Sequence, residues 1–139
     1  MIINIIAAIG WITIIGISPF WKSADKFVIG IVVCLVAGVY CYLNFSHINE
    51  SGGPAGFSTF EGVSKIFSNP WLIDAAWAHI IAFELVVTML IRNNAAKHGI
   101  NYATVIIILL ITMFLAPLGL MIYILARRIK TKYYFTALS

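Results

Sequence analysis

An apolar stretch at residues 71–91 carries three titratable side chains, and this combination limits what the chain can fold into. The stretch follows Pro70 and is long enough to cross a bilayer, yet it contains Asp74, His79 and Glu84. A charged side chain at the centre of a bilayer costs about 2.5–3.5 kcal/mol on insertion scales. These three side chains therefore need polar partners, a cavity or a functional role.

The composition places the chain in a membrane rather than in water. Of its 139 residues, 62% are hydrophobic and 10% are charged, whereas soluble domains are about half apolar and a quarter charged. So few polar side chains do not cover a water-facing surface. We therefore expect an integral membrane protein whose first partner is the lipid bilayer.

Four apolar runs predict the architecture. Each is close to the roughly 20 residues that cross a bilayer core as a helix. We expect an all-α fold, a four-transmembrane-helix bundle that forms a single domain over residues 1–139. Its spans are predicted at about 2–21, 27–44, 71–91 and 102–126. The first run ends in Pro19-Phe20-Trp21-Lys22 rather than in a small-residue cleavage site, so we expect it to be retained as a span.

A short amphipathic helix is predicted between spans two and three, at about residues 57–68. Four apolar residues recur there at three- and four-residue steps, as on one helix face: Phe57, Phe60, Val63 and Phe67. Ser58 and Glu61 have the spacing of a capping box. This helix either lies in the membrane interface as an anchor or covers one end of the bundle as a lid.

Local signals mark the ends of spans three and four. Asn69 is suited to cap span three, and Pro70 suits its first turn. Gly99 is a suitable stop before the next apolar run. Pro117 removes a backbone hydrogen bond from span four and predicts a kink, either for packing alone or with a freed carbonyl near Met113 facing a cavity.

The net charge of +4 comes from residues at helix ends and does not indicate a nucleic-acid partner. The cluster of Arg127, Arg128, Lys130 and Lys132 follows a span and is typical of a headgroup anchor. With four crossings, four cations fall on one side of the membrane and five on the other. The division is nearly even, and the dense tail cluster favours an N-terminus inside the cell.

The sequence predicts no metal and no cofactor. Cys34 and Cys41 are seven residues apart on one apolar helix, roughly 10 Å along its axis. That separation is too large for a disulfide within the helix. No group of histidine, cysteine and carboxylate residues has metal-ligand spacing.

Helical geometry places a polar stripe on one face of span three. At about 100° per residue, one face collects five side chains: Asp74, Trp77, Glu84, Thr88 and Arg92. His79 falls on the other side. We expect the stripe to face the interior of the bundle, where Trp77 either packs or stacks on an elongated, conjugated ligand.

Glu84 is the strongest candidate for chemistry because it lies near mid-span. Apolar surroundings disfavour its charged form, and a neutral carboxylic acid donates protons. Asp74 is about 15 Å away along the axis, so the partners must come from other helices, with Asn4, Tyr40, Tyr42 and Thr112 as candidates. The alternative is that Glu84 holds helices together through hydrogen bonds.

Asp74 and His79 each have a structural alternative as well. Asp74 lies in the first turn of span three, where a carboxylate stabilises the helix dipole. His79 either makes a structural hydrogen bond or points into a cavity.

Two motifs resemble those of a known family. The first is Asn69-Pro70-Trp71 followed by Trp77-Ala78-His79 and by Ala82-Phe83-Glu84-Leu85; the second runs from Leu110 and Thr112 to Pro117-Leu118-Gly119-Leu120. Together with Trp11 and Pro19 they resemble the abscisic-acid-deficient-four-like membrane proteins over nearly the whole chain. Glu84 stands where the family often has aspartate, Ala116 replaces a glycine, and Thr88 stands where a glycine is expected.

The resemblance implies a part in xanthophyll conversion, since plant members are required for neoxanthin formation. That conversion opens an epoxide and removes a neighbouring proton, so it needs an acid, a base and no redox cofactor. The implied catalytic residues are Glu84 as acid, with Asp74 or His79 as base. The implied ligand-binding residues are Trp77, Thr88, Arg92, Trp71, Tyr40 and Pro117.

The sequence is compatible with three functions. The first is a cofactor-independent isomerase or binder of a carotenoid or related isoprenoid lipid in a bacterial cytoplasmic (inner) membrane. The second is a non-catalytic membrane module that assembles or stabilises a partner enzyme; a homo-oligomer is the other partner we consider, and it would favour the third function. The third is a small transporter or proton conduit that uses Asp74, Glu84 and Arg92.

Overall fold

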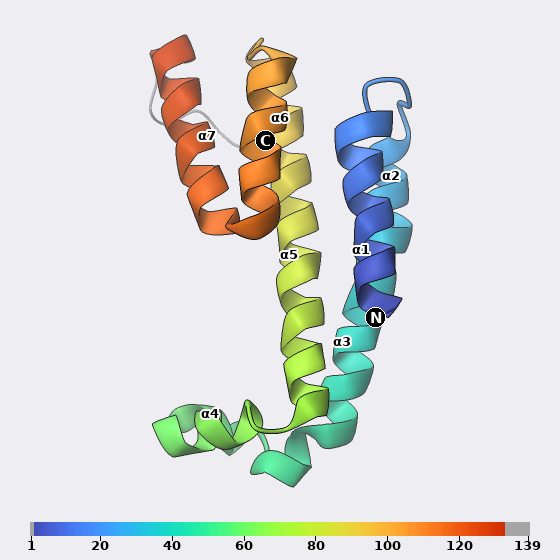
Figure 1. The fold of residues 1–139 in the computed structure, drawn as a ribbon, viewed down its shortest axis with the longest axis vertical. Coiled ribbons are helices and arrows are strands. Elements are labelled where there is room, and N and C mark those ends of the chain that lie inside the picture. Colours follow the sequence, from blue (N-terminus) through green and yellow to red (C-terminus); the bar gives the residue numbers. More distant parts are fainter. Residues whose placement is uncertain (1, 133–139) are drawn as a thin grey trace.

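The computed structural model describes residues 2–132, and all of their regular structure is helical (Figure 1). The elements are α1 (Ile2–Ile12), η1 (Thr13–Ile17), α2 (Ala24–Phe27), η2 (Val28–Val33), α3 (Cys34–His47), η3 (Ile48–Ser51), η4 (Pro54–Ser58), α4 (Phe60–Ile66), α5 (Pro70–Lys97), α6 (Tyr102–Phe114) and α7 (Ala116–Thr131). The predicted all-α fold is thus confirmed for the described residues. Met1 and residues 133–139 of the predicted domain lie outside them.

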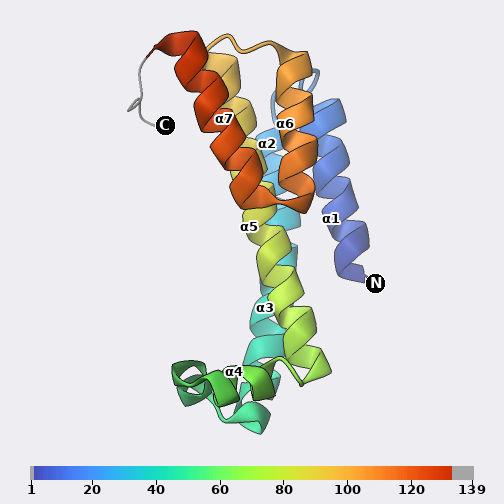
Figure 2. The ribbon, with the colours of Figure 1, turned by 60° about the vertical axis from the view of Figure 1, so that its left-hand side comes forward.

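Two long antiparallel helices form the axis of the molecule. The helical run Ala24–Glu50, made of α2, η2, α3 and the start of η3, has 27 residues, and α5 has 28. At 1.5 Å per residue both are about 40 Å long. Among residues 2–132, they are the two helices that are long and apolar enough to cross a membrane. Figures 1 and 2 show α3 and α5 side by side along one half of this length.

The ends of α5 follow the local signals in the sequence. The Asn69 side chain accepts a hydrogen bond from the Trp71 backbone N–H at 3.0 Å, and Pro70 is the first helical residue. Gly99 follows the helix with a φ of +62°, a conformation that glycine adopts without strain. The helix runs to Lys97 rather than to the expected residue 91, so Arg92 is helical instead of beginning a connector.

The first span is shorter than predicted. Helix α1 continues as the π-helix η1 and ends at Ile17, not at residue 21. Pro19 follows after one residue, and it has no N–H with which to continue a helix. The resulting 16-residue helix is about 24 Å long, so α1 and η1 cover only part of the length of α5 (Figure 1).

The predicted single span over residues 102–126 is wrong. Helix α6 ends at Phe114, Leu115 adopts φ −143° and ψ 73°, and α7 begins at Ala116 and runs back beside α6 (Figure 2). In a continuous helix the Pro117 ring would clash with the preceding turn; here Pro117 lies in the first turn of a new helix instead. The expected kink is therefore a complete reversal, and α6 and α7 form a hairpin.

The helix predicted at 57–68 is shorter and starts later. A 3₁₀ turn, η4, precedes α4, and the two lie across one end of the long helices (Figure 1). Thr59 caps α4 by accepting a hydrogen bond from the Gly62 N–H at 3.1 Å, so the capping box predicted from Ser58 is wrong. Ile66 of α4 is buried in a small cluster with Ile48 and Leu72, which fixes this segment against the ends of α3 and α5.

The main core lies where the short helices meet α5. It contains Trp11 and Ile14 from the first helix, Val32 from η2, Leu85 from α5 and Leu109 from α6. Gly10 brings α1 close to α5, because a Cβ there would lie 2.9 Å from Leu85 Cδ2. Close helix contacts of this kind stabilise helix bundles in lipid, where apolar burial by itself contributes little.

Replacing Gly119 by alanine should destabilise the hairpin. Gly119 faces Thr112 across the α6–α7 contact, and an added Cβ would lie 2.7 Å from the Thr112 Cα. Overpacking of this kind costs about 1–3 kcal/mol. The midpoint of thermal unfolding of the purified protein in mild detergent should fall. Gly38→Ala is the matched control, because a Cβ there meets nothing within 4 Å; an equal fall in both variants would contradict the close α6–α7 contact.

Candidate functional site

A pocket of about 200 Å³ lies beside the middle of α5, between the start of α1 and the turn of the hairpin. Its walls come from three helices: Asn4, Ala7, Ala8 and Trp11 of α1, Trp77, Ile81 and Glu84 of α5, and Met113 and Phe114 of α6. We call this the Glu84 pocket. Trp77 and Glu84 line it together, as the helical geometry of α5 predicted.

One hydrogen bond ties the start of α1 to α5 at this pocket. The indole N–H of Trp77 donates to the Asn4 side-chain oxygen at 2.8 Å. Trp77 is otherwise half exposed, so its ring forms part of the pocket wall rather than of the core. The hydrogen bond fixes the orientation of that ring.

Glu84 is partly buried, and its carboxyl group makes no hydrogen bond or ion pair within residues 2–132. Of its predicted partners, Asn4 shares the pocket but bonds to Trp77, while Thr112 is buried and donates to the Ile108 carbonyl at 2.8 Å. Tyr40 lies in another pocket. The carboxyl group is therefore open to a molecule in the pocket.

The size and lining of the Glu84 pocket define what it accepts. An apolar protein cavity of about 150 Å³ binds benzene, so the Glu84 pocket is large enough for one six-membered ring. Its walls are aromatic and aliphatic, and its polar groups are few. A neutral carboxylic acid in such a setting is a single proton donor to a bound ring.

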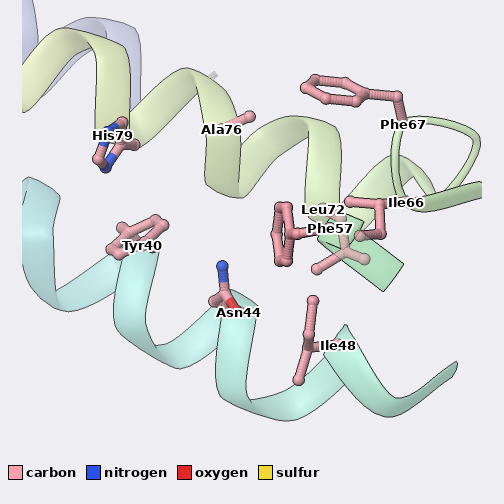
Figure 3. Close-up of a pocket in the computed structure, with 9 residues that line it drawn as sticks. All are labelled: Tyr40, Asn44, Ile48, Phe57, Ile66, Phe67, Leu72, Ala76 and His79. Atoms are coloured by element: carbon pink, nitrogen blue, oxygen red, sulfur yellow. The ribbon is translucent and has the colours of Figure 1, made fainter. Parts of the chain in front are cut away.

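His79 lies in a second pocket, of about 180 Å³, on another face of α5 (Figure 3). Its ring centroid is 5.1 Å from that of Tyr40 and 4.7 Å from that of Phe83. Phe57 and Phe67, which flank α4, line the opposite end of this second pocket. His79 and Tyr40 are thus brought together, but they are not in the Glu84 pocket.

The other predicted site residues lie outside both the Glu84 pocket and the second pocket that contains His79. Asp74 is exposed on α5, and the exposed Trp71 ring stacks on His47 with centroids 5.3 Å apart. Pro117 is exposed in the first turn of α7. Thr88 is buried, and its hydroxyl has no hydrogen-bond partner among the described residues.

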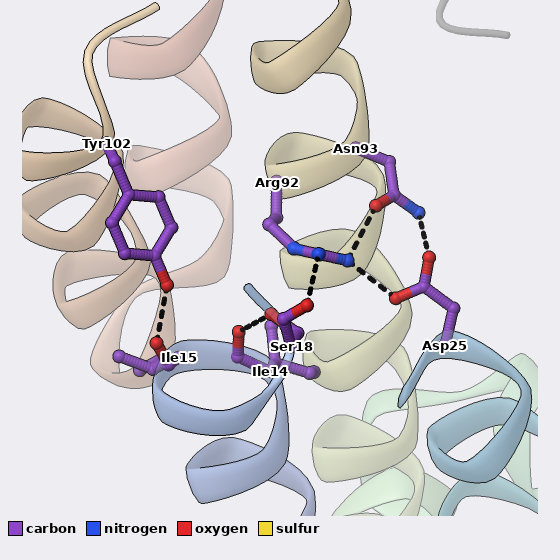
Figure 4. Close-up of polar contacts among 7 residues, drawn as sticks. All are labelled: Ile14, Ile15, Ser18, Asp25, Arg92, Asn93 and Tyr102. Atoms are coloured by element: carbon purple, nitrogen blue, oxygen red, sulfur yellow. Dashed lines mark hydrogen bonds and ion pairs between the residues drawn. The ribbon is translucent and has the colours of Figure 1, made fainter. Parts of the chain in front are cut away.

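Arg92 holds the turn between η1 and α2 (Figure 4). Its guanidinium donates to Asp25 at 2.8 Å, to the Ser18 carbonyl at 3.1 Å and to the Asn93 side chain at 2.9 Å. The Asn93 amide donates to the second Asp25 oxygen at 2.7 Å. Nearby, the Tyr102 hydroxyl of α6 donates to the Ile15 carbonyl. Arg92 therefore fastens the first helix to α5 and does not reach the Glu84 pocket.

Asn94, which follows Asn93 in α5, holds the α6–α7 hairpin against α5. Its side-chain oxygen accepts a hydrogen bond from the Tyr123 hydroxyl and another from Arg127 at 3.0 Å. Arg127 is only 3% exposed, so its predicted role as a headgroup anchor is wrong. Sequence reasoning missed Asn94 and Asp25, because their partners come from distant helices. The three consecutive polar residues Arg92, Asn93 and Asn94 at the end of an apolar helix could have indicated Asn94, but no such signal marks Asp25.

Over residues 2–132, the fold and the site define an all-helical protein with two helices of membrane-spanning length and a carboxyl group in an apolar, ring-sized pocket. Within residues 2–132, no group of three or more histidine, cysteine or carboxylate side chains is placed to hold a metal. The chain matches the family model of the ABA DEFICIENT 4-like proteins over residues 1–123, and it belongs to this family. No curated protein and no solved structure matches it. The family and the two long helices support association with a membrane.

Proposed function

We propose that the chain is embedded in a bilayer, in a bacterial inner membrane, with the two long helices as full crossings. The shorter helices, α1–η1, α6 and α7, then enter the bilayer from one side and reach about half its depth. Large apolar side chains on their outer surfaces support this placement, among them Ile2, Ile107 and Phe114, which are all exposed. This arrangement replaces the four predicted crossings.

We propose that the Glu84 pocket binds the ring end of a carotenoid or a related isoprenoid lipid, and that Glu84 donates a proton to it. The observation that carries this proposal is a carboxyl group that makes no hydrogen bond or ion pair within residues 2–132 and lies in an apolar, ring-sized pocket beside Trp77. Glu84 lies near the middle of α5, so the pocket is at the depth of the acyl chains, where such lipids are dissolved. The family resemblance supports the same ligand class.

An isomerisation at this pocket requires only the one carboxyl group. With an epoxide-bearing ring bound, Glu84 donates its proton to the epoxide oxygen, and the carbon–oxygen bond breaks with its electron pair going to oxygen. The Glu84 carboxylate then accepts a proton from a neighbouring carbon, whose bonding pair forms the new double bond. The proton count and the oxidation state are unchanged. Asp74 and His79 are not needed as bases, which fits their positions away from the pocket.

The third function, a proton conduit, receives no support from the geometry. Such a conduit would need Asp74, Glu84 and Arg92 along one polar path. Asp74 is exposed, and Arg92 is paired with Asp25 at 2.8 Å.

Pigment bound to the purified protein tests the ligand class. We expect protein from a carotenoid-producing host to carry a polyene, visible in its absorption spectrum and identified by mass spectrometry after extraction. Trp77→Ala should reduce the bound polyene about tenfold, as expected for loss of an aromatic anchor. Trp71→Ala is the matched control, because Trp71 stacks on His47 away from the pocket.

Two results would contradict the proposal. Equal loss of pigment in both tryptophan variants would place the ligand elsewhere. Colourless wild-type protein, with the pigments of the host unchanged, would favour the second function, a non-catalytic module that stabilises a partner enzyme. Copurification of that enzyme would then be measured.

A further inference from the structure

The cationic side chains of the protein gather at one end of the long helices. Eight of its nine lysine and arginine residues lie there: Lys22, Lys26, Arg92, Lys97, Arg127, Arg128, Lys130 and Lys132. They come from the η1–α2 turn, the end of α5 and the last turns of α7, which Figure 1 places at the same end. Lys65 of α4 lies at the opposite end.

The hairpin is the reason for this asymmetry. A fourth crossing would carry the α7 cluster to the side opposite Lys97, and the cations would divide four against five. Because α7 runs back beside α6, its cluster lies instead at the end of the molecule that holds the 98–101 connector (Figure 2). The division becomes eight against one.

The acidic residues have the opposite distribution. Glu50, Glu61 and Asp74 lie at the α4 end, and Asp25, at the cationic end, is paired with Arg92. The two ends of the molecule therefore carry opposite net charge. Cytoplasmic segments of membrane proteins carry the excess of lysine and arginine, and the cytoplasmic leaflet is rich in anionic lipid.

We infer that the exposed lysine and arginine side chains of the cationic end, which do not include the buried Arg127, contact the anionic lipid headgroups of the cytoplasmic leaflet. This inference rests on the membrane placement proposed above. Both the η1–α2 turn and the 98–101 connector then face the cytoplasm, together with the last turn of α7. The α4 segment lies at the opposite surface of the membrane, and the Glu84 pocket opens to the half of the bilayer that the short helices leave uncovered.

Labelling of single cysteines tests this orientation. Cys34 and Cys41 are first replaced by alanine, and one cysteine is introduced at Ser23, Ala96, Ile129 or Ser58, all of which are exposed. The variants are expressed in a bacterial inner membrane and treated with a membrane-impermeant maleimide. Ser58→Cys should react in intact spheroplasts, whereas the other three should react only after permeabilisation. Retention of the protein in carbonate-washed membranes is measured in parallel.

The labelling results separate the possible failures. The reverse pattern in carbonate-resistant protein would overturn the orientation and leave the membrane placement intact. Reaction of Ala96→Cys and Ile129→Cys from opposite sides would overturn the hairpin. Release of the protein by carbonate would overturn the membrane placement, and the orientation with it.

Charge removal tests whether the cations set the orientation. Replacing Lys22, Lys26, Lys130 and Lys132 by glutamine should invert the orientation of a substantial fraction of the protein molecules. In that fraction the cysteine of Ser58→Cys should no longer react in intact spheroplasts. Lys65→Gln is the matched control and should leave the pattern unchanged. An unchanged pattern in the fourfold variant would overturn the proposed contact with anionic headgroups.

Discussion

Replacing Glu84 by glutamine should abolish conversion of a ring-oxygenated polyene while the protein still folds. Glutamine has nearly the same shape as glutamate but has no carboxyl proton to donate. General acid–base catalysis contributes about 10²–10⁴-fold to rate, and a loss of at least 100-fold is expected. Because the carboxyl group makes no bond within residues 2–132, its replacement should leave the thermal unfolding midpoint nearly unchanged.

The measurement is the change in the carotenoid composition of a host that expresses the protein, determined by chromatography and mass spectrometry. Glu84→Asp should keep part of the conversion, since it retains the acid on a shorter side chain. Asp74→Asn is the matched control, because Asp74 is exposed and outside the pocket. Full conversion by Glu84→Gln would remove Glu84 from the chemistry; equal losses in the Glu84 and Asp74 variants would point to an indirect effect.

Replacing Asn94 by leucine should have the largest effect on stability. Asn94 is 1% exposed, and its side-chain oxygen accepts hydrogen bonds from both Tyr123 and Arg127. Leucine has no such acceptor, so the buried Tyr123 hydroxyl and the buried Arg127 guanidinium each lose this hydrogen bond. Each loss costs about 1–3 kcal/mol, and more for a charged group, so a total of about 3 kcal/mol is expected. The hairpin should detach from α5 first, because these bonds hold it there.

Thermal unfolding in detergent and protease sensitivity of the hairpin report this effect. Tyr123→Phe should cost less than Asn94→Leu, since it removes only one of the donors. Tyr42→Phe, at an exposed position, should cost almost nothing. An Asn94→Leu protein as stable as the wild type would contradict the role of Asn94 in holding α7.

The parts of the structure that depend on local signals were predictable. Asn69 and Pro70 act on their immediate neighbours, and they mark the start of α5 where it was predicted; its end, at Lys97, lies beyond the predicted residue 91. The relative positions of Trp77, Glu84 and His79 follow from helical periodicity alone, and the two pockets confirm them. The part of a site that one helix contributes is therefore predictable from the sequence, whereas the walls that other helices contribute are not.

The parts that depend on distant contacts were not predictable. An apolar run of 25 residues has the same composition whether it crosses a bilayer or turns back within it. Pro117 indicates a break but not its angle, which the close contact of Gly119 with Thr112 determines. Arg92 lay on the predicted polar stripe, but its partner Asp25 is 67 residues away in sequence. No periodicity relates the two.

The short helices make several polar contacts with α5 at the Arg92 end and few beside the Glu84 pocket. Arg92, Asn93 and Asn94 tie both short units to a single turn of α5. At the pocket, by contrast, the start of α1 is held by the hydrogen bond from Trp77 to Asn4 and by apolar contacts that lipid tails can replace. One neutral hydrogen bond contributes only about 1 kcal/mol. In the proposed membrane placement, a lipid that enters from the bilayer has to break this hydrogen bond and displace apolar contacts at the start of α1 to reach Glu84.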